Sequence, residues 1–292
     1  MPVLAIDQGT SATKAVVVDG ERILATAEAP VTVDGSADGA VAVGPEALWS
    51  SVVAAGRRAL DEAGSPAIDA IGLANQGETI LAWDRATGRP HGRAIVWQDR
   101  RSSVVCDRLA AHADELAHIT GLELDPYFVA PKFAWLRERT DAALAITTTD
   151  TWLLHRLCGA FVTDVATAGR TLLLDLETCE WSDRACELFD VDRTTMPRLV
   201  GNAEPLGECT VFGNATAVAG ACVDQQAALY AQRCRSAGEA KCTYGTGAFL
   251  LAQLAQAWEV GFIELKVGDV QLDALQAVRE EYARSHGVVP FE

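Results

Sequence analysis

Short apolar runs alternate with turn residues at the start of the chain. Residues 2–7 (PVLAID), 13–19 (TKAVVVD) and 22–29 (RILATAEA) have the length and composition of strands. The dipeptide Asp19-Gly20, between the second and third runs, is a hairpin signal. The pattern therefore predicts an antiparallel meander of three strands.

A helical pattern follows at residues 45–64, with Pro45 near its start and Gly64 at its end. Residues 68–76 (IDAIGLANQ) read as a buried strand. Farther along, the pattern predicts strands at 79–84 and 94–99 around a turn at 85–92, and helices at 102–118, 129–139 and 150–159.

The last recognisable elements are a buried strand at 216–224, a helix at 225–234 and a strand-turn-strand unit at 239–254. The turn Gly245-Thr246-Gly247 weakly repeats the opening Gly9-Thr10. The order of elements predicts an α/β protein of two related halves.

Composition and charge limit the kinds of molecule that this chain is expected to bind. The chain has 292 residues, which is enough for about two domains, with 49% hydrophobic and 22% charged residues, as in ordinary globular proteins. A net charge of −16 argues against binding nucleic acid or an anionic membrane, because phosphates would be repelled. This net charge does not exclude a small phosphate ligand that binds beside a local cation. No uncharged apolar run is long enough to span a bilayer.

Cysteine usage indicates the compartment. None of the eight cysteines forms a C-x-x-C pair, and the five histidines lack metal-ligand spacing, so a zinc site is not expected. Buried, reduced thiols are the favoured interpretation. The N-terminus has no basic segment followed by an apolar one, so no secretory signal is predicted and a cytoplasmic location is expected.

Three stretches could carry chemistry. In AIDQGTSATKA, Asp7 precedes a Gly/Thr/Ser turn that could hold phosphate, and its carboxylate could hold Mg²⁺, with Lys14 as a nearby cation. The alternative, that Asp7 only starts a turn, is favoured on this stretch alone. In CVDQQAALY, Asp224 follows a buried strand and could be either a helix N-cap or a general base, and Gln225 could orient the same substrate.

The third stretch, LANQGETILAWD, places Asn75, Gln76 and Glu78 at the end of a buried strand, where they could bind polyol hydroxyls. Trp97 and Tyr127 could offer apolar faces to a carbon skeleton. For each aromatic residue taken singly, core packing is the better interpretation.

Taken together, these stretches resemble the FGGY carbohydrate kinases, and among them most closely the glycerol kinases. The resemblance runs from residue 3 to about residue 251, in family order and at family spacing. The matching stretches are AIDQGTSATKA, NQGETILAWDRATGRP, AIVWQDRR, GLELDPYFVAPKFAW, TTDTWLLHRLCG, AGRTLLLD, AGACVDQQAALYAQ and AKCTYGTGAFLL. It implies an actin-like, ribonuclease H-like fold and transfer of the ATP γ-phosphate, with Mg²⁺, to a hydroxyl of glycerol or a related polyol or sugar.

The resemblance also implies roles for individual residues. Asp224 would be the general base, and Asp7 would lie near the metal. The polyol-contact positions are Gln76, Glu78, Trp97, Tyr127, Asp224 and Gln225, and the phosphate-contact positions are Thr10, Ser11, Ala12, Lys14, Thr246 and Gly247.

The sequence departs from the family at several points. The family usually has Arg where Gly77 stands, so a cation that contacts the substrate is missing and the space released would admit a longer polyol or a sugar. The family often has Arg at Lys14, and Val129 is unusual in the stretch after Tyr127.

The family pattern fades after residue 251. We expect an N-terminal, substrate-binding domain at residues 1–235 and a truncated remnant of the nucleotide-binding domain at 236–292. In the tail, Asp269 could cap a helix with an apolar stripe at Leu272, Leu275 and Val278, ended by Gly287.

Two functions remain open from sequence. One is an active polyol or sugar kinase. The other is a catalytically silent, truncated relative that binds a polyol or a partner chain. The missing part of the second domain would expose apolar surface, which predicts a homo-oligomer or a partner chain. An actin-like structural or chaperone ATPase fits poorly, because DPYFVAPKFAW and VDQQAAL are typical of the sugar kinases.

Overall fold

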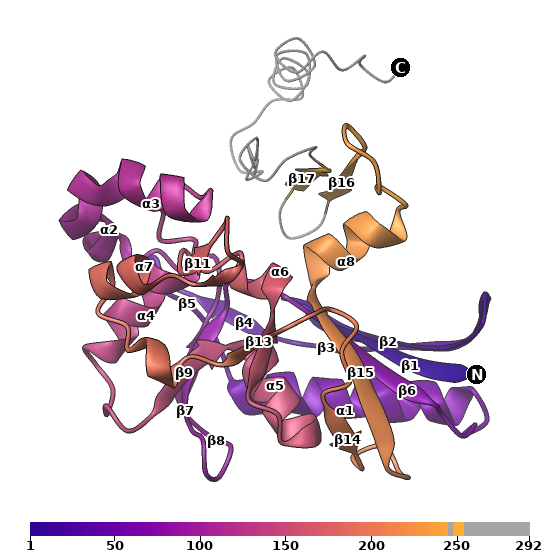
Figure 1. Ribbon diagram of the computed structural model, residues 1–292. Helices are drawn as coiled ribbons and strands as arrows, with labels where there is room; N and C mark the ends of the chain where they lie inside the picture. The colour runs from indigo at the N-terminus through magenta and orange to yellow at the C-terminus, as the bar shows by residue number, and fades with distance from the viewer. Residues whose placement is uncertain (245–247, 254–292) are drawn as a thin grey trace. The chain divides into compact units, whose positions relative to one another are not determined.

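A computed structural model of the chain describes residues 1–244 and 248–253 (Figure 1). The chain divides into two compact units, Met1–Asp224 and Gln225–Glu292, which are described separately. The predicted tail helix after Asp269 lies outside the described residues.

The first unit is built on a six-stranded sheet in the order β14-β15-β6-β1-β2-β3. The predicted meander is confirmed, because β1 pairs antiparallel with β2, and β2 with β3. β1 and β15 flank β6 and run parallel to it. The strands are β1 (Pro2–Gln8), β2 (Ala12–Asp19), β3 (Arg22–Pro30), β6 (Ala70–Asn75), β14 (Gly207–Cys209) and β15 (Thr216–Val223).

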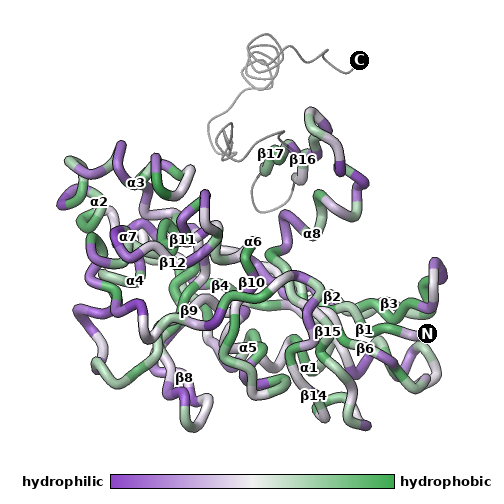
Figure 2. Tube along the Cα trace, viewed as in Figure 1, coloured by the Kyte–Doolittle hydropathy of each residue, from purple (hydrophilic) through white to green (hydrophobic). Residues whose placement is uncertain are grey.

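Side chains that alternate along these strands bury one face of the sheet. In β1, Leu4, Ile6 and Gln8 are buried while Ala5 and Asp7 are exposed. The helix α1 (Pro45–Glu62) lies against β1, β2 and β3, and α5 (Thr149–Cys158) lies against β6, β14 and β15. Figure 2 shows that the strands of this sheet are mainly apolar. This core holds the strand ends in register.

A second sheet has the order β4-β5-β8-β7-β9. Its strands are β4 (Val33–Gly35), β5 (Val41–Val43), β7 (Ile80–Asp84), β8 (Arg89–Ile95) and β9 (Ala145–Thr148). Trp83 is fully buried in it and donates from Nε1 to Thr147 Oγ1 at 2.9 Å. Because β7 follows β6 after a short connection, this sheet is held close to the end of β6.

Helices and short strands complete the unit. The helices are α2 (Ser103–Leu109), α3 (Ala113–Thr120), α4 (Val129–Arg137), α6 (Val165–Ala168) and α7 (Asp183–Leu188), with 3₁₀ turns η1 (Ala110–His112) and η2 (Arg193–Thr195). The short strands are β10 (Val162–Asp164), which pairs with β13 (Arg198–Val200), and β11 (Leu174–Asp175), which pairs with β12 (Glu180–Trp181).

Two predicted elements differ from the structure. The predicted helix at 102–118 is interrupted by η1, so it forms α2 and α3. The strand predicted at 94–99 is β8, which begins at Arg89 and ends at Ile95. It begins early because Asp84 Oδ1 accepts from the backbone N–H of Ala86 and Thr87, which closes the turn within a few residues.

The second unit contains most of the helix α8 (Asp224–Ala231) and the antiparallel pair β16 (Ala240–Tyr244) and β17 (Ala248–Ala252). These agree with the predicted helix and the predicted strand-turn-strand unit. The turn residues 245–247 lie outside the described residues.

Candidate active site

The carboxyl ends of three neighbouring strands meet at one edge of the six-stranded sheet. In the parallel register, Val223 of β15 lies beside Asn75 of β6, and Asn75 lies beside Gln8 of β1. Asp224 follows Val223 directly as the first residue of α8. Ligands of open α/β sheets bind at this edge. Stretches far apart in the sequence therefore bring candidate residues together here.

The turn between β1 and β2 is tight. Gly9 donates its backbone N–H to the Ala12 carbonyl at 3.0 Å, and Val31 donates to the Ser11 carbonyl at 2.8 Å. A Cβ at Gly9 would lie 3.3 Å from the Ala12 oxygen, which favours glycine there. The predicted phosphate-contact residues Thr10, Ser11 and Ala12 are therefore held in a fixed turn.

Asp7 and Lys14 face each other across the β1–β2 pair. The Asp7 side chain is exposed, yet nearby protein removes enough water from its carboxyl group to raise its pKa, and Lys14 opposes that shift. A divalent cation would favour the charged form of this carboxylate. Mg²⁺ is commonly held by one or two carboxylates, with water and phosphate oxygens as the other ligands, and Asp7 fits such a site.

A network of buried amides joins the predicted substrate residues to the phosphate turn. Asn75 Nδ2 donates to Gln8 Oε1 at 2.7 Å, and Gln76 Nε2 donates to the same oxygen at 3.2 Å. Gln76 Oε1 accepts from Thr10 Oγ1 and Thr79 Oγ1, both at 3.2 Å. Gln76 is thus fixed between the end of β6 and the β1–β2 turn.

Trp97 and Tyr127 pack against each other with a ring-centroid distance of 5.8 Å in an edge arrangement. Both are buried, and Trp97 Nε1 donates to Thr10 Oγ1 at 2.9 Å. Trp97 lies outside β8 because the chain turns at 96–99, where the buried Asp99 carboxylate accepts from the Val41 N–H at 2.8 Å. The loop thus directs Trp97 toward the phosphate turn.

Glu78 forms a buried ion pair with Arg170. Arg170 Nε donates to Glu78 Oε1 at 2.6 Å, and their side chains are 10% and 5% exposed, respectively. The guanidinium also lies 5.7 Å from the Tyr127 ring centroid and 5.1 Å from that of Phe128. Sequence reasoning assigned no role to Arg170. Its only signal was its place in the family-like stretch AGRTLLLD.

Glu78 also has a backbone φ of +55°, which is unusual for a residue other than glycine. Such strained residues persist where the surrounding structure fixes them, and they cluster at functional sites. The ion pair to Arg170 is one such constraint.

Lys132 holds the backbone that carries Tyr127. It is fully buried, and its Nζ donates to the backbone carbonyls of Tyr127 and Phe128. Val129, the departure noted from the sequence, is the first residue of α4 and is buried. The backbone that carries Tyr127 is therefore anchored by a buried cation.

Gly77 lies against Val223. A Cβ at Gly77 would be 3.0 Å from Val223 Cγ2, and both residues are buried. Val223 thus occupies space that a side chain at position 77 would need on this side.

Gly77→Arg is expected to lower the free energy of unfolding by about 1–3 kcal/mol, because overpacking forces Val223 to move. Urea denaturation of Gly77→Arg, Val223→Gly and the double variant measures this. The double variant should lose less than the sum of the single losses. Strict additivity would show that the two positions do not compete for space.

Gln225 belongs to the second unit. There its Oε1 accepts a hydrogen bond from Lys241 Nζ, which also donates to Thr243 Oγ1 at 2.7 Å. Lys241 is buried, and sequence reasoning missed it. The predicted phosphate-contact residues Thr246 and Gly247 lie outside the described residues.

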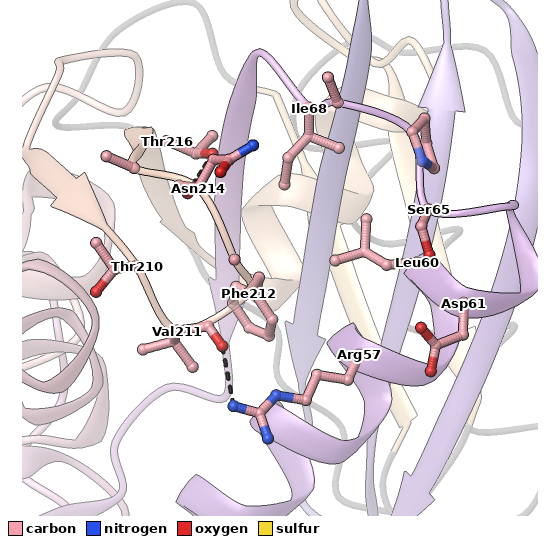
Figure 3. Close-up of a pocket in the computed structure, with 14 residues that line it drawn as sticks. Arg57, Leu60, Asp61, Ser65, Ile68, Thr210, Val211, Phe212, Asn214 and Thr216 are labelled. Carbon is pink, nitrogen blue, oxygen red and sulfur yellow. Dashed lines mark hydrogen bonds between the residues drawn. The ribbon is translucent and has the colours of Figure 1, made fainter.

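A pocket of about 740 Å³ lies at the opposite, amino ends of β6 and β15 (Figure 3). It is lined by α1, by the loop that leads to β6 and by the β14–β15 loop, with Arg57 donating to the Val211 carbonyl at 3.1 Å. None of the predicted site residues lines it. This pocket is therefore separate from the candidate active site.

Phe212 in this loop packs on Gly56 of α1, where an added Cβ would lie 2.4 Å from the ring. Gly56→Ala is expected to destabilise the protein by about 1–3 kcal/mol, although alanine alone would favour the helix by about 1 kcal/mol. In a Phe212→Ala background the same change should stabilise. Urea denaturation of the four proteins checks both signs, and stabilisation in both backgrounds would contradict the predicted contact.

Within the described residues, no group of three or more His, Cys, Asp or Glu side chains is arranged to hold a metal ion. The same part of the chain contains no helix both long and apolar enough to cross a membrane. All eight cysteines lie in it as free thiols, without a disulfide.

The family model for the N-terminal domain of the FGGY carbohydrate kinases matches residues 2–231. A glycerol kinase from Delftia acidovorans is 41% identical over 85% of this chain and 53% of its own length. One from Methylibium petroleiphilum is 43% identical over the same shares. The chain thus spans about half the length of these relatives.

Solved structures of other proteins also resemble this chain. The Plasmodium falciparum glycerol kinase with ADP superposes with a TM-score of 0.80 at 30% identity, over 85% of this chain and 53% of that one. The Rhodospirillum rubrum xylulose kinase gives a TM-score of 0.81 at 19% identity, over 88% and 56% of the two chains, which supports the fold alone. The predicted actin-like α/β fold is confirmed, and the similarity covers the N-terminal domain.

Proposed function

The chain belongs to the FGGY family of carbohydrate kinases, and we propose that it binds a polyol or sugar and promotes transfer of the ATP γ-phosphate to one of its hydroxyl groups, with Asp224 as general base. The observation that carries the proposal is the convergence of Asp224, Gln76 and the β1–β2 turn at one edge of the sheet.

Acceptor binding is assigned to the side chains around the buried Glu78. Trp97 and Tyr127 offer an apolar wall for the carbon skeleton, and Glu78 offers carboxylate oxygens to hydroxyl donors. Gln76 is assigned to the same acceptor site, where its position is fixed by the hydrogen bond from Thr10. Each of these side chains already contacts another residue of the protein, so its conformation is largely fixed before the acceptor binds. The family resemblance assigns Gln225 to acceptor binding as well.

In the reaction, the Asp224 carboxylate accepts the proton of the attacking hydroxyl. The acceptor oxygen forms a bond to the γ-phosphorus as the bond to the bridging oxygen breaks and ADP leaves. Such transfers depend mainly on positioning and on charge balance. The position of Asp224 immediately after a strand held by β6 supplies that positioning.

The β1–β2 turn is assigned to the phosphates. Its Thr10 and Ser11 hydroxyls, the Ala12 backbone and the Lys14 ammonium would bind phosphate oxygens. The family resemblance assigns phosphate binding to Thr246 and Gly247 as well, which lie outside the described residues. Asp7 would hold Mg²⁺, which neutralises phosphate charge when bound. A cytoplasmic setting, where the free thiols stay reduced, belongs to the same proposal.

A second candidate function is suggested by the length of this chain compared with that of its relatives. Because the chain spans about half of its relatives, it could bind a polyol without turnover, or act with a second copy or a partner chain. Light scattering tests whether the protein forms an oligomer, because a monodisperse monomer would count against association with a second copy.

The test is ADP formation by the purified protein with Mg-ATP, across glycerol, erythritol, ribitol, xylitol, xylulose and ribulose, with a control lacking acceptor. We expect ADP that depends on one of these acceptors. No ADP above the control, from folded protein, would reject the kinase proposal in favour of the silent one.

A further inference from the structure

The half of β15 that leads to Asp224 is supported differently from the half that precedes it. β14 pairs with residues Thr216–Val218 only. The register of β15 against β6 then shifts between Val218 and Gly220, and β15 continues to Val223. Among the described residues, no strand pairs with the outer edge of this second half.

Asn202 takes the place of a strand at that edge. Its Nδ2 donates to the Ala221 carbonyl at 3.0 Å, three positions before Asp224. Its backbone also approaches Gly220 closely, since a Cβ at Gly220 would lie 2.2 Å from the Asn202 carbonyl oxygen. Only glycine allows that approach. A side chain thus supplies the hydrogen bond that a neighbouring strand would otherwise give.

Asn202 is itself fixed on its other side. The same Nδ2 donates to Asp164 Oδ1 at 2.8 Å, so both amide hydrogens have acceptors. Asp164 is fully buried, and its Oδ1 also caps α6 by accepting from the Thr167 N–H at 3.0 Å. β10 and β13 pair Asp164 with Val200, two positions before Asn202. The amide therefore has one orientation and a rigid anchor.

Asp164, to which Asn202 is tied, lies in a buried environment that disfavours a charged carboxylate. Burial raises the pKa of Asp164, and the hydrogen bonds from Thr167 and Asn202 oppose that shift. Asp150 is also buried, and desolvation, together with the charge of Asp164, raises its pKa to about 6. The hydrogen bonds from Thr167 and Asn202 therefore favour the charged form of the Asp164 carboxylate. The position of Asn202 is therefore strongly determined.

We propose that Asn202 is a positioning residue for Asp224: it ties the end of β15 to Asp164 and thereby sets where the Asp224 carboxylate stands against the acceptor. This rests on the proposed role of Asp224 as base. Asn202 touches neither acceptor nor nucleotide in this account, so it acts only through the strand.

The variant is Asn202→Ala, and the matched control is Asn214→Ala, which removes an amide from an exposed residue of the β14–β15 loop. Hydrogen exchange by mass spectrometry compares peptides covering 219–224 with peptides covering β1 and β2. We expect exchange at 219–224 to rise at least about tenfold in Asn202→Ala, with β1 and β2 unchanged, because only the end of β15 loses a hydrogen bond. The control should match the native protein.

The functional readout is turnover with the best acceptor. We expect kcat to fall about 10–100-fold while the KM for Mg-ATP stays the same, since a displacement of about 1 Å costs about that much. If Asn202→Ala fails to fold, Asn202→Ser, with a shorter donor, is measured in the same way.

Native-like exchange at 219–224 in the variant would overturn the proposal, and so would a uniform rise over the whole protein, which indicates a structural role. Locally raised exchange with unchanged kcat would also overturn it. Failure of the base assignment looks different: Asp224→Asn would then keep full turnover, whatever Asn202→Ala does.

Discussion

Arg170→Met is expected to lower the free energy of unfolding by about 3–5 kcal/mol, because it leaves the Glu78 carboxylate buried without its cation. Acceptor binding should be lost with it, since Glu78 and the ring of Tyr127 both contact this guanidinium. Urea denaturation at pH 7 measures the first effect, and calorimetric titration of the polyol measures the second.

The control is Arg58→Met in α1, which breaks an exposed pair with Glu62 and should cost no more than about 1 kcal/mol. The double variant Glu78→Leu with Arg170→Met should lose less than Arg170→Met alone, because it buries no unpaired charge. A loss from Arg170→Met as small as the control would contradict the buried ion pair.

Asp224→Asn is expected to lower the rate of phosphoryl transfer by about 10²–10⁴-fold while leaving acceptor binding nearly intact. The amide has the shape of the carboxylate but cannot accept the proton. Initial rates with Mg-ATP and the best acceptor measure this, alongside titration of the acceptor. Asp61→Asn, in α1 beside the distant pocket, is the matched control and should behave as the native protein. Unchanged turnover in Asp224→Asn would remove the base assignment.

The sequence predicted most of the central sheet. The apolar runs of β1, β2, β6 and β15 are separated by clear turn residues, so their pattern alone indicates strands. It also predicted that the ends of β6 and β15 carry polar residues. Their meeting in space needed only the parallel pairing that the structure shows.

The remaining parts depend on tertiary contacts that no local pattern encodes. β8 ends at Ile95 because the next residues form a loop around the buried Asp99. Glu78 pairs with Arg170, which lies 92 positions later in the sequence. Asn202 in a turn looks like an ordinary loop residue until its amide is found between Asp164 and Ala221. Such contacts can be seen only in the folded chain.

The central claim is that this chain forms the acceptor-binding part of a carbohydrate kinase. Calorimetric titration of the purified protein with the same polyols and sugars, without nucleotide, tests it most directly. We predict saturable binding of at least one of them at one site per chain, and loss of that binding in Trp97→Ala. No binding of any of these acceptors by folded protein would contradict the claim.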